Sequence, residues 1–369
     1  MGFKNVLGDP CLFKRVLPDG QVIMACTYVD DVTFACSSQD SADWFMRALR
    51  ERFMIEEGEG KAIDFLLGMA IDQDLEKGTV SINMETLIAR LAEGILTKEE
   101  LERSKSVDTP MLVTPLQKLS ERIVPKDKFD YLSVVGSLLH ISNCVRMDIA
   151  LAVGILARHA ATPGPAHVTA AKRVLQYLYH TRSLGITYTR STTDQNVPTI
   201  YEAASHPLDN GKNRLQVFCD SDYAADISRR SLMGMVVMLN GGPISWLSTL
   251  GKTVCTSTAE AEVSAAVAAA KEAVHLKRML IDLDIMDESS PILIAEDNAA
   301  CIAQCEARLR HVRNAKHYEV RLRFLQQLVV DGEIQFRYCP TDHMVADYLT
   351  KPLDATKFLY FRQRTMVHP

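Results

Sequence analysis

The chain has 369 residues, of which 47% are hydrophobic and 24% are charged, and its formal net charge is -5. Its length allows two or three domains of roughly 100–200 residues each, and its acidic balance argues mildly against a nucleic-acid-binding protein. No apolar run reaches the roughly 18 residues of a membrane span, and the first residues lack the apolar core of a signal peptide, so we expect an intracellular protein without a membrane partner.

The N-terminal third has the pattern of a mixed α/β segment. Apolar runs over 22–28 and 32–36 predict two strands, and Asp30 and Asp31 lie between them at the tip of a hairpin. Apolar spacing and a Glu-Lys-Gly turn then predict a helix over 43–53 and a second hairpin with strands over 65–72 and 79–84.

Two stretches rich in proline and polar residues divide the chain. The first, over about 105–128, is a predicted linker, and the second, over 191–211, marks another boundary. Between them the apolar periodicity predicts helices over 131–144, 148–159 and 166–180. We therefore expect three parts, which cover 1–112, 113–205 and 206–369.

From residue 215 onward three predicted strands come first, and helices and strands then alternate. This order predicts a mixed sheet flanked by helices. The expected strands cover 215–220, 232–239, 244–249, 291–296 and 333–339. The expected helices cover 258–283, 298–305, 313–330 and 342–350.

Four acidic residues give the main chemical signal. Asp220 and Asp297 lie at the ends of strand-like runs, whereas Glu262 and Asp347 lie on helix-like segments. Acids at element ends can converge although they are far apart in sequence, and converging carboxylates repel each other unless divalent cations lie between them. Carboxylates suit hard Mg²⁺, and the nine cysteines include no C-x-x-C pair, which argues against zinc.

A basic segment lies over 308–323. Within it Arg313, Lys316, His317 and Arg321 recur at helical spacing, and we expect them to form a face for a phosphate backbone. A solvated helix face is the alternative interpretation of the same residues.

Eight short motifs occur in one order over nearly the whole chain. Each alone is common, but the eight in register are specific, and together they resemble the reverse transcriptase–ribonuclease H region of copia-type retrotransposon Pol polyproteins. The motifs are Tyr28-Val29-Asp30-Asp31, Asp220-Ser221-Asp222-Tyr223-Ala224, Gly241-Gly242-Pro243-Ile244-Ser245-Trp246, Glu260-Ala261-Glu262, Lys271-Glu272-Ala273, Asp297-Asn298, Lys316-His317 and Ala346-Asp347-Tyr348-Leu349-Thr350-Lys351-Pro352-Leu353.

The resemblance implies a C-terminal ribonuclease H domain, with a mixed five-stranded sheet and four catalytic acids that hold metal. Asp220, Glu262, Asp297 and Asp347 match these acids, which implies two ions of Mg²⁺ or Mn²⁺ and an RNA–DNA hybrid as the substrate. Glu260 competes with Glu262 for the second position. The residues that follow Glu262 fit the family pattern, so we favour Glu262.

Three nearby residues have open interpretations. Asp222 is expected to be a spacer or a surface acid. His343, four residues before the last acid, either aids product release or proton transfer or is an exposed helix residue. Trp246 either packs in the core, which we favour, or stacks on nucleic acid.

The resemblance also implies that Asp30 and Asp31 belong to the palm of a reverse transcriptase. Polymerisation there needs a further acid from an earlier palm strand. In the family that acid and the fingers precede the segment that matches Gly2-Phe3-Lys4, so we expect a truncated palm without polymerase activity.

The sequence therefore predicts a mixed α/β protein, which combines a truncated palm, a helical connection and a ribonuclease H-like sheet. The predicted function is metal-dependent cleavage of RNA in RNA–DNA hybrids, and the rest of a Pol polyprotein is a candidate partner. The alternative function is that of a catalytically inert transposon relic or a non-catalytic nucleic-acid-binding protein.

Overall fold

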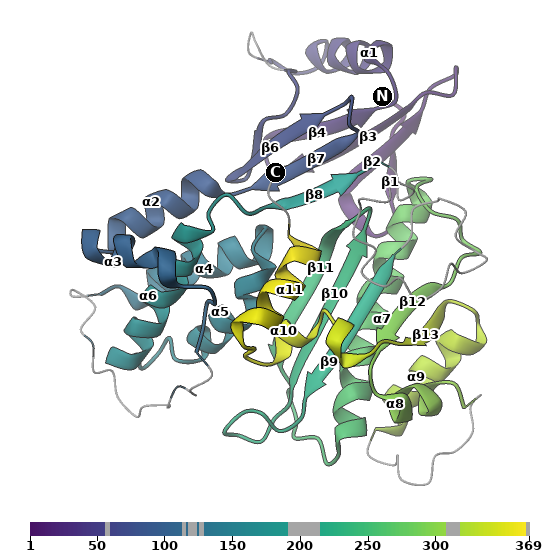
Figure 1. The fold of residues 1–369 in the computed structure, drawn as a ribbon. Helices are drawn as coiled ribbons and strands as arrows, with labels where there is room; N and C mark the ends of the chain where they lie inside the picture. Colours follow the sequence, from purple (N-terminus) through teal and green to yellow (C-terminus); the bar gives the residue numbers. More distant parts are fainter. Residues whose placement is uncertain are drawn as a thin grey trace. The chain divides into compact units, whose positions relative to one another are not determined.

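The computed structural model of the chain describes residues 1–55, 60–112, 116, 124, 129–190, 215–307 and 318–366 (Figure 1). The chain divides into two compact units. One comprises Met1–Asp64 and Glu272–Ser290, and the other comprises Phe65–Lys271 and Pro291–Pro369. Within the described residues, no helix is long and apolar enough to cross a membrane. The predicted division at 112 and 205 stays a prediction.

The first unit contains a four-stranded antiparallel sheet in the order β1-β2-β3-β4, followed by helix α1. Ile23 and Ala25 alternate along β3 and pack with Phe45 of α1 in a small core. Ser38 begins α1 with a reciprocal capping box, which is why the helix starts earlier than the predicted 43–53. The elements are β1 (Lys4–Val6), β2 (Asp9–Val16), β3 (Val22–Tyr28), β4 (Asp31–Cys36) and α1 (Gln39–Arg50).

The second unit begins with an antiparallel sheet in the order β5-β6-β7-β8. The predicted strand 65–72 is wrong in one respect, because a turn at Leu67 and Gly68 divides it. Both residues have positive φ, 50° and 86°, as a tight two-residue hairpin turn requires. The strands are β5 (Phe65–Leu66), β6 (Met69–Asp74), β7 (Thr79–Asn83) and β8 (Ile186–Thr189).

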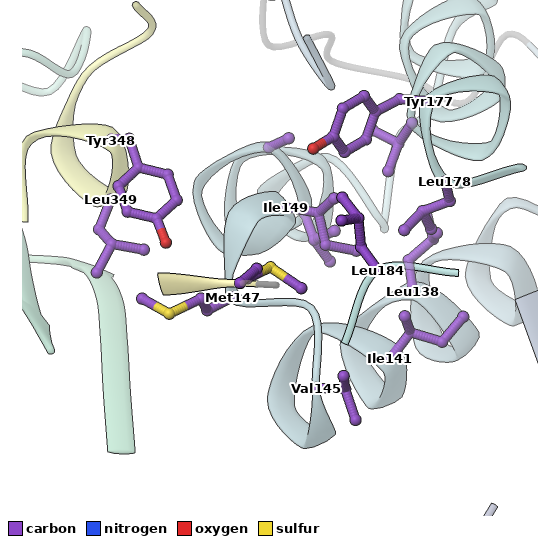
Figure 2. Close-up of a cluster of buried hydrophobic side chains, with 14 of the residues drawn as sticks. Leu138, Ile141, Val145, Met147, Ile149, Tyr177, Leu178, Leu184, Tyr348 and Leu349 are labelled. Carbon is purple, nitrogen blue, oxygen red and sulfur yellow. The ribbon is translucent and has the colours of Figure 1, made fainter. Parts of the chain in front are cut away.

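A helical region lies between β7 and β8 in the sequence and builds the main apolar core. Asp130 accepts a hydrogen bond from Ser133 N and so fixes the start of α4, which has the predicted bounds. Figure 2 shows Leu138 and Ile141 of this helix within the buried cluster. The helices are α2 (Glu85–Ile95), α3 (Lys98–Arg103), α4 (Tyr131–Cys144), α5 (Ala150–Arg158) and α6 (Pro165–His180).

The C-terminal region forms a five-stranded sheet in the order β11-β10-β9-β12-β13. Strands β9, β10 and β11 are antiparallel neighbours, whereas β12 runs parallel to both β9 and β13. The expected mixed sheet is therefore confirmed. The strands are β9 (Gln216–Asp222), β10 (Leu232–Leu239), β11 (Gly242–Leu250), β12 (Ile292–Glu296) and β13 (Ile334–Tyr338), and the helices are α7 (Thr258–Asp282), α8 (Ala299–Cys305) and α9 (Glu319–Val330).

Two C-terminal helices, α10 (Asp347–Thr350) and α11 (Ala355–Thr365), complete this unit. The sequence interpretation missed α11. Tyr348 and Leu349 of α10 enter the same buried cluster as Met147 of the helical region, as Figure 2 shows. The short helix α10 is therefore held firmly where it meets the sheet.

Candidate metal centre

Asp220 lies near the end of β9, the central strand of the five-stranded sheet. Its neighbour across the ladder is Gly234 of β10. A side chain there would collide with α10, since a Cβ would lie 2.7 Å from Thr350 Cγ2 and 3.0 Å from Ala346 O. The missing Cβ of Gly234 thus lets α10 approach Asp220 closely, and the Thr350 hydroxyl donates a hydrogen bond to the Asp220 carboxylate.

Glu262 lies in the second turn of α7, and only 4% of its surface is exposed. Its Oε2 atom has no hydrogen-bond partner. Glu260 differs, because its Oε2 accepts hydrogen bonds from Thr256 N at 2.7 Å and from Thr256 Oγ1 at 2.9 Å. The structure therefore places Glu262, and not Glu260, among the converging acids.

Asp297 follows the last residue of β12, and its Oδ2 accepts a hydrogen bond from Thr341 Oγ1 at 2.8 Å. One carboxylate oxygen each from Asp220, Glu262 and Asp297 lie within 4.8 Å of one another. Carboxylate oxygens at this spacing repel each other in a buried site, and hard divalent cations prefer such ligands. The donor set and the unpartnered Glu262 oxygen fit Mg²⁺ or Mn²⁺.

Burial and repulsion between carboxylates raise the pKa values of Glu262 and Asp220. Burial, and then the nearby Asp220 carboxylate, raises the pKa of Glu262 to about 8. Burial also raises the pKa of Asp220 to about 6, although the Lys351 ammonium acts in the opposite direction. In both groups, burial and adjacent negative charge outweigh the compensation that Lys351 supplies.

Asp347, the fourth predicted acid, is fully buried at the start of α10. It does not belong to the converging group of three. Its two oxygens instead pair with lysines, Oδ1 with Lys351 Nζ at 3.0 Å and Oδ2 with Lys357 Nζ at 2.9 Å. Lys351 Nζ also lies 3.7 Å from Asp220 Oδ2, so this side chain links Asp347 to the three acids.

Sequence reasoning missed three charged groups around these acids, namely Lys351, Lys357 and Glu296. Lys351 follows Asp347 by four residues, a spacing common in ion pairs that could have revealed it, although Lys351 itself lies just beyond the end of α10. Glu296 is fully buried and accepts a hydrogen bond from the Cys219 thiol at 3.3 Å. Burial raises the pKa of Glu296 well above its ordinary range.

The sequence left the roles of Trp246, His343 and Asp222 open, and the structure gives the first two a polar partner. The Trp246 indole donates a hydrogen bond to Ser142 O at 2.9 Å and packs against the main core. The His343 ring nitrogen Nδ1 lies 2.8 Å from the Tyr360 hydroxyl. Asp222 is half-buried at the end of β9, and burial raises its pKa.

Asp30 and Asp31 lie at the tip of the β3–β4 hairpin, as predicted, and both are exposed. Val29, the first residue of the turn, has a φ of 55° and is 87% exposed. A β-branched residue rarely adopts this conformation, so the hairpin tip stores backbone strain. Within the described residues, no third acid or other metal-ligating group joins this pair.

The predicted nucleic-acid face can be followed only in part. Arg313, Lys316 and His317 lie outside the described residues. Arg321 lies on α9, where its side chain is 40% exposed and donates a hydrogen bond to Ser264 Oγ of α7 at 3.0 Å.

No protein-family model matches the chain. Over 99% of its length it is 29% identical to the Retrovirus-related Pol polyprotein from transposon TNT 1-94 of Nicotiana tabacum, of which it covers 26%. It spans about a quarter of the length of the curated Pol polyproteins that it matches. It is also 30% identical to the putative transposon Ty5-1 protein of Saccharomyces cerevisiae, a match that covers 67% of the chain and 72% of that protein.

Among solved structures, the chain is similar to LC11-RNase H1 in complex with RNA/DNA hybrid, at 13% identity and a TM-score of 0.29. That match covers 37% of this chain and 94% of the other. The Nicotiana tabacum Pol polyprotein matches nearly the whole chain, and the chain covers more than two thirds of the Saccharomyces cerevisiae Ty5-1 protein. The chain therefore belongs to the family of copia-type retrotransposon Pol proteins.

Proposed function

We propose that the C-terminal region of the chain is a metal-dependent ribonuclease H, which cuts the RNA strand of an RNA–DNA hybrid. The observation that carries this proposal is the convergence of Asp220, Glu262 and Asp297, whose carboxylate oxygens lie within 4.8 Å of one another although they come from three separate elements. A buried carboxylate cluster costs folding free energy, so its presence favours a site that binds cations over a structural core.

Each acid has a part that follows from its environment. Asp220 is oriented by the Thr350 hydroxyl and Asp297 by the Thr341 hydroxyl, so both present a fixed oxygen toward the shared centre. Glu262 is held by the buried first turns of α7 and has an oxygen with no other partner. Bound Mg²⁺ or Mn²⁺ ions, two by family resemblance, would activate water and stabilise the leaving oxygen during phosphodiester hydrolysis.

The proposed substrate follows from the family and from the basic segment. Arg321 is partly exposed on α9, and with Arg313, Lys316 and His317 it would contact the phosphate backbone of the hybrid without reading its sequence. The rest of a Pol polyprotein is the proposed protein partner, because the curated relatives are much longer than this chain.

We also propose that these 369 residues alone do not polymerise DNA. Asp30 and Asp31 are exposed at one hairpin tip, and no third acid joins them within the part of the chain that the structure describes. A metal pair for nucleotide transfer needs ligands from more than one strand.

The test of the nuclease proposal is cleavage of a hybrid whose RNA strand is labelled. The purified chain should cut that strand when Mg²⁺ or Mn²⁺ is present and should stop when a chelator is added. The same RNA as a single strand, or in an RNA duplex, is the matched control and should remain largely intact. Equal cleavage of all three substrates, or cleavage that persists in the chelator, would contradict the proposal.

A further inference from the structure

One face of α10 and the residue after it meet the acidic centre. Asp347 and Thr350 follow the i, i+3 spacing that places side chains on one helix face, and Lys351 is the extended residue that ends the helix. The Lys351 ammonium lies 3.0 Å from Asp347 Oδ1 and 3.7 Å from Asp220 Oδ2, so it lies between acids from two different elements. Lys357 contacts the other oxygen of Asp347 at 2.9 Å.

The charges in this centre limit how many divalent ions it can hold. The four carboxylates of Asp220, Glu262, Asp297 and Asp347, taken as ionised, and the two lysine ammonium groups carry a formal net charge of minus two. A single divalent cation neutralises this charge. A second cation close to Asp220 and Asp347 would meet the Lys351 ammonium, and like charges a few ångströms apart repel strongly in a partly buried site.

Lys351 is also able to move away. Its side chain is 32% exposed, whereas the carboxylates that it contacts are 3% and 0% exposed. Lysine carries its charge on a flexible four-carbon stem, so the ammonium can turn toward solvent without a change in the backbone. The Lys351 side chain can thus leave the position between Asp220 and Asp347, whereas these two carboxylates are buried.

We propose that Lys351 acts as a built-in cation between Asp220 and Asp347, so that the protein alone binds one divalent ion tightly and a second only weakly. The tight ion lies at Asp220, Glu262 and Asp297. The second ion binds well only when the Lys351 ammonium has moved away. This inference rests on the proposed function, because it concerns the same carboxylates, and it makes Lys351 a positioning residue that controls metal stoichiometry.

The test is a Mn²⁺ titration of the full chain after chelator treatment, with free Mn²⁺ measured by electron paramagnetic resonance. The wild-type protein should bind one ion tightly and a second at least ~10-fold more weakly, which corresponds to 1.4 kcal/mol or more. Lys351→Gln removes the charge but keeps a side-chain N–H group that can donate to Asp347. This variant should bind the second ion at least ~10-fold more tightly than the wild type does.

Lys357→Gln is the matched control, because it removes the same charge from Asp347 Oδ2, whereas Lys351 pairs with Asp347 Oδ1 and lies near Asp220. It should change the affinity for the second ion by less than ~3-fold, since only a general charge effect remains. Equal effects of the two variants, or no effect of Lys351→Gln, would overturn the inference. Thermal unfolding of each variant shows whether it folds.

Wild-type stoichiometry provides a second measurement, and the Lys351→Arg variant complements it. Two ions bound with equal affinity would overturn the inference about Lys351 and would leave the proposed function intact. No bound Mn²⁺ at all would instead contradict the proposed metal centre. One tight ion, with Lys351→Arg indistinguishable from the wild type, would support the role of the positive charge.

Discussion

The guanidinium of Arg146 and the carboxylate of Asp148 form a fully buried ion pair, in which Nε and Nη2 donate to the two carboxylate oxygens at 2.9 and 2.7 Å. The Tyr177 hydroxyl donates to the same carboxylate at 2.5 Å, and Arg146 also donates to the backbone and hydroxyl oxygens of Thr181. Arg362 of α11 donates to the Tyr177 hydroxyl at 3.2 Å. This network therefore joins α11 to the helical region.

Replacement of Asp148 by asparagine should destabilise the protein by about 3–5 kcal/mol, because it leaves the Arg146 guanidinium buried without a counter-charge. Urea unfolding followed by circular dichroism measures this loss. The matched control is Asp226→Asn, which breaks the partly exposed pair with Arg158 and should cost about 1 kcal/mol or less. Equal losses in the two variants would show that burial does not set the value of the Arg146 pair.

Replacement of Asp297 by asparagine should abolish hybrid cleavage while the fold remains intact, because the amide keeps the volume but loses the charge at the metal. Asp222→Asn should cost far less, since Asp222 lies outside the three converging acids. Cleavage rates under saturating Mg²⁺, together with the thermal unfolding of both variants, check this prediction. A near-normal rate for Asp297→Asn would remove Asp297 from the site.

The stability of chelator-treated protein should fall as the pH rises. Burial raises the folded-state pKa of Glu262 from 4.5 to about 8 and that of Asp220 from 3.8 to about 6. Between the ordinary and the raised pKa of each group, the folded state binds more protons than the unfolded state does. The free energy of unfolding therefore decreases as the pH rises. The contribution is fully present below about pH 4 and is lost once the pH passes about 8. Unfolding at a series of pH values measures it.

Glu262→Gln gives the control for this pH dependence, because glutamine cannot ionise. The variant should show a flatter decrease between about pH 6 and 8, where Glu262 is the group that titrates. It should also be more stable than the wild-type protein at pH 8 when no metal is added. The same slope in both proteins would mean that Glu262 ionises in its ordinary range.

Local sequence patterns predicted most helices and strands, but they could not predict contacts between residues that are distant in the sequence. Helix α4 has the predicted bounds because apolar periodicity and an aspartate cap at Asp130 act in the same direction. The strand over 65–72 was wrong because the positive φ of Leu67 depends on the turn and not on its own apolar character. The sequence did not predict that Arg146 and Asp148 form a buried ion pair, because charged residues usually lie on the protein surface.

The candidate site shows the same division between local and distant information. The acids were chosen from motif order, and each lies at or near the end of an element that the sequence reveals. The place of Lys351 between Asp347 and Asp220 depends on how closely α10 approaches β10, which the absence of a Cβ at Gly234 permits. This packing joins residues more than a hundred positions apart, so it produces no periodic pattern in the sequence that could predict it.

Combined replacement of Arg313, Lys316 and Arg321 by neutral residues should weaken hybrid binding by a similar factor for all sequences. Each lost phosphate contact should also reduce the log–log salt slope by roughly one unit. Fluorescence anisotropy at several salt concentrations measures both effects. A matched control is Arg103→Gln, Lys105→Gln and Arg190→Gln, which removes the same charge elsewhere. An unchanged slope in the first variant would mean that the basic segment is only a solvated face.

Primer extension on an RNA template, with dNTPs and Mg²⁺, should give no product from the 369-residue chain alone. Asp30 and Asp31 supply carboxylates from a single exposed hairpin, and within the described residues no third acid joins them. Nucleotide transfer depends largely on the positioning of metal, primer and triphosphate, so an incomplete metal site should remove activity outright and not merely reduce it. The control carries Asp30→Asn and Asp31→Asn. Templated extension above that control would mean that another carboxylate, such as Asp9 or Asp19, completes the site.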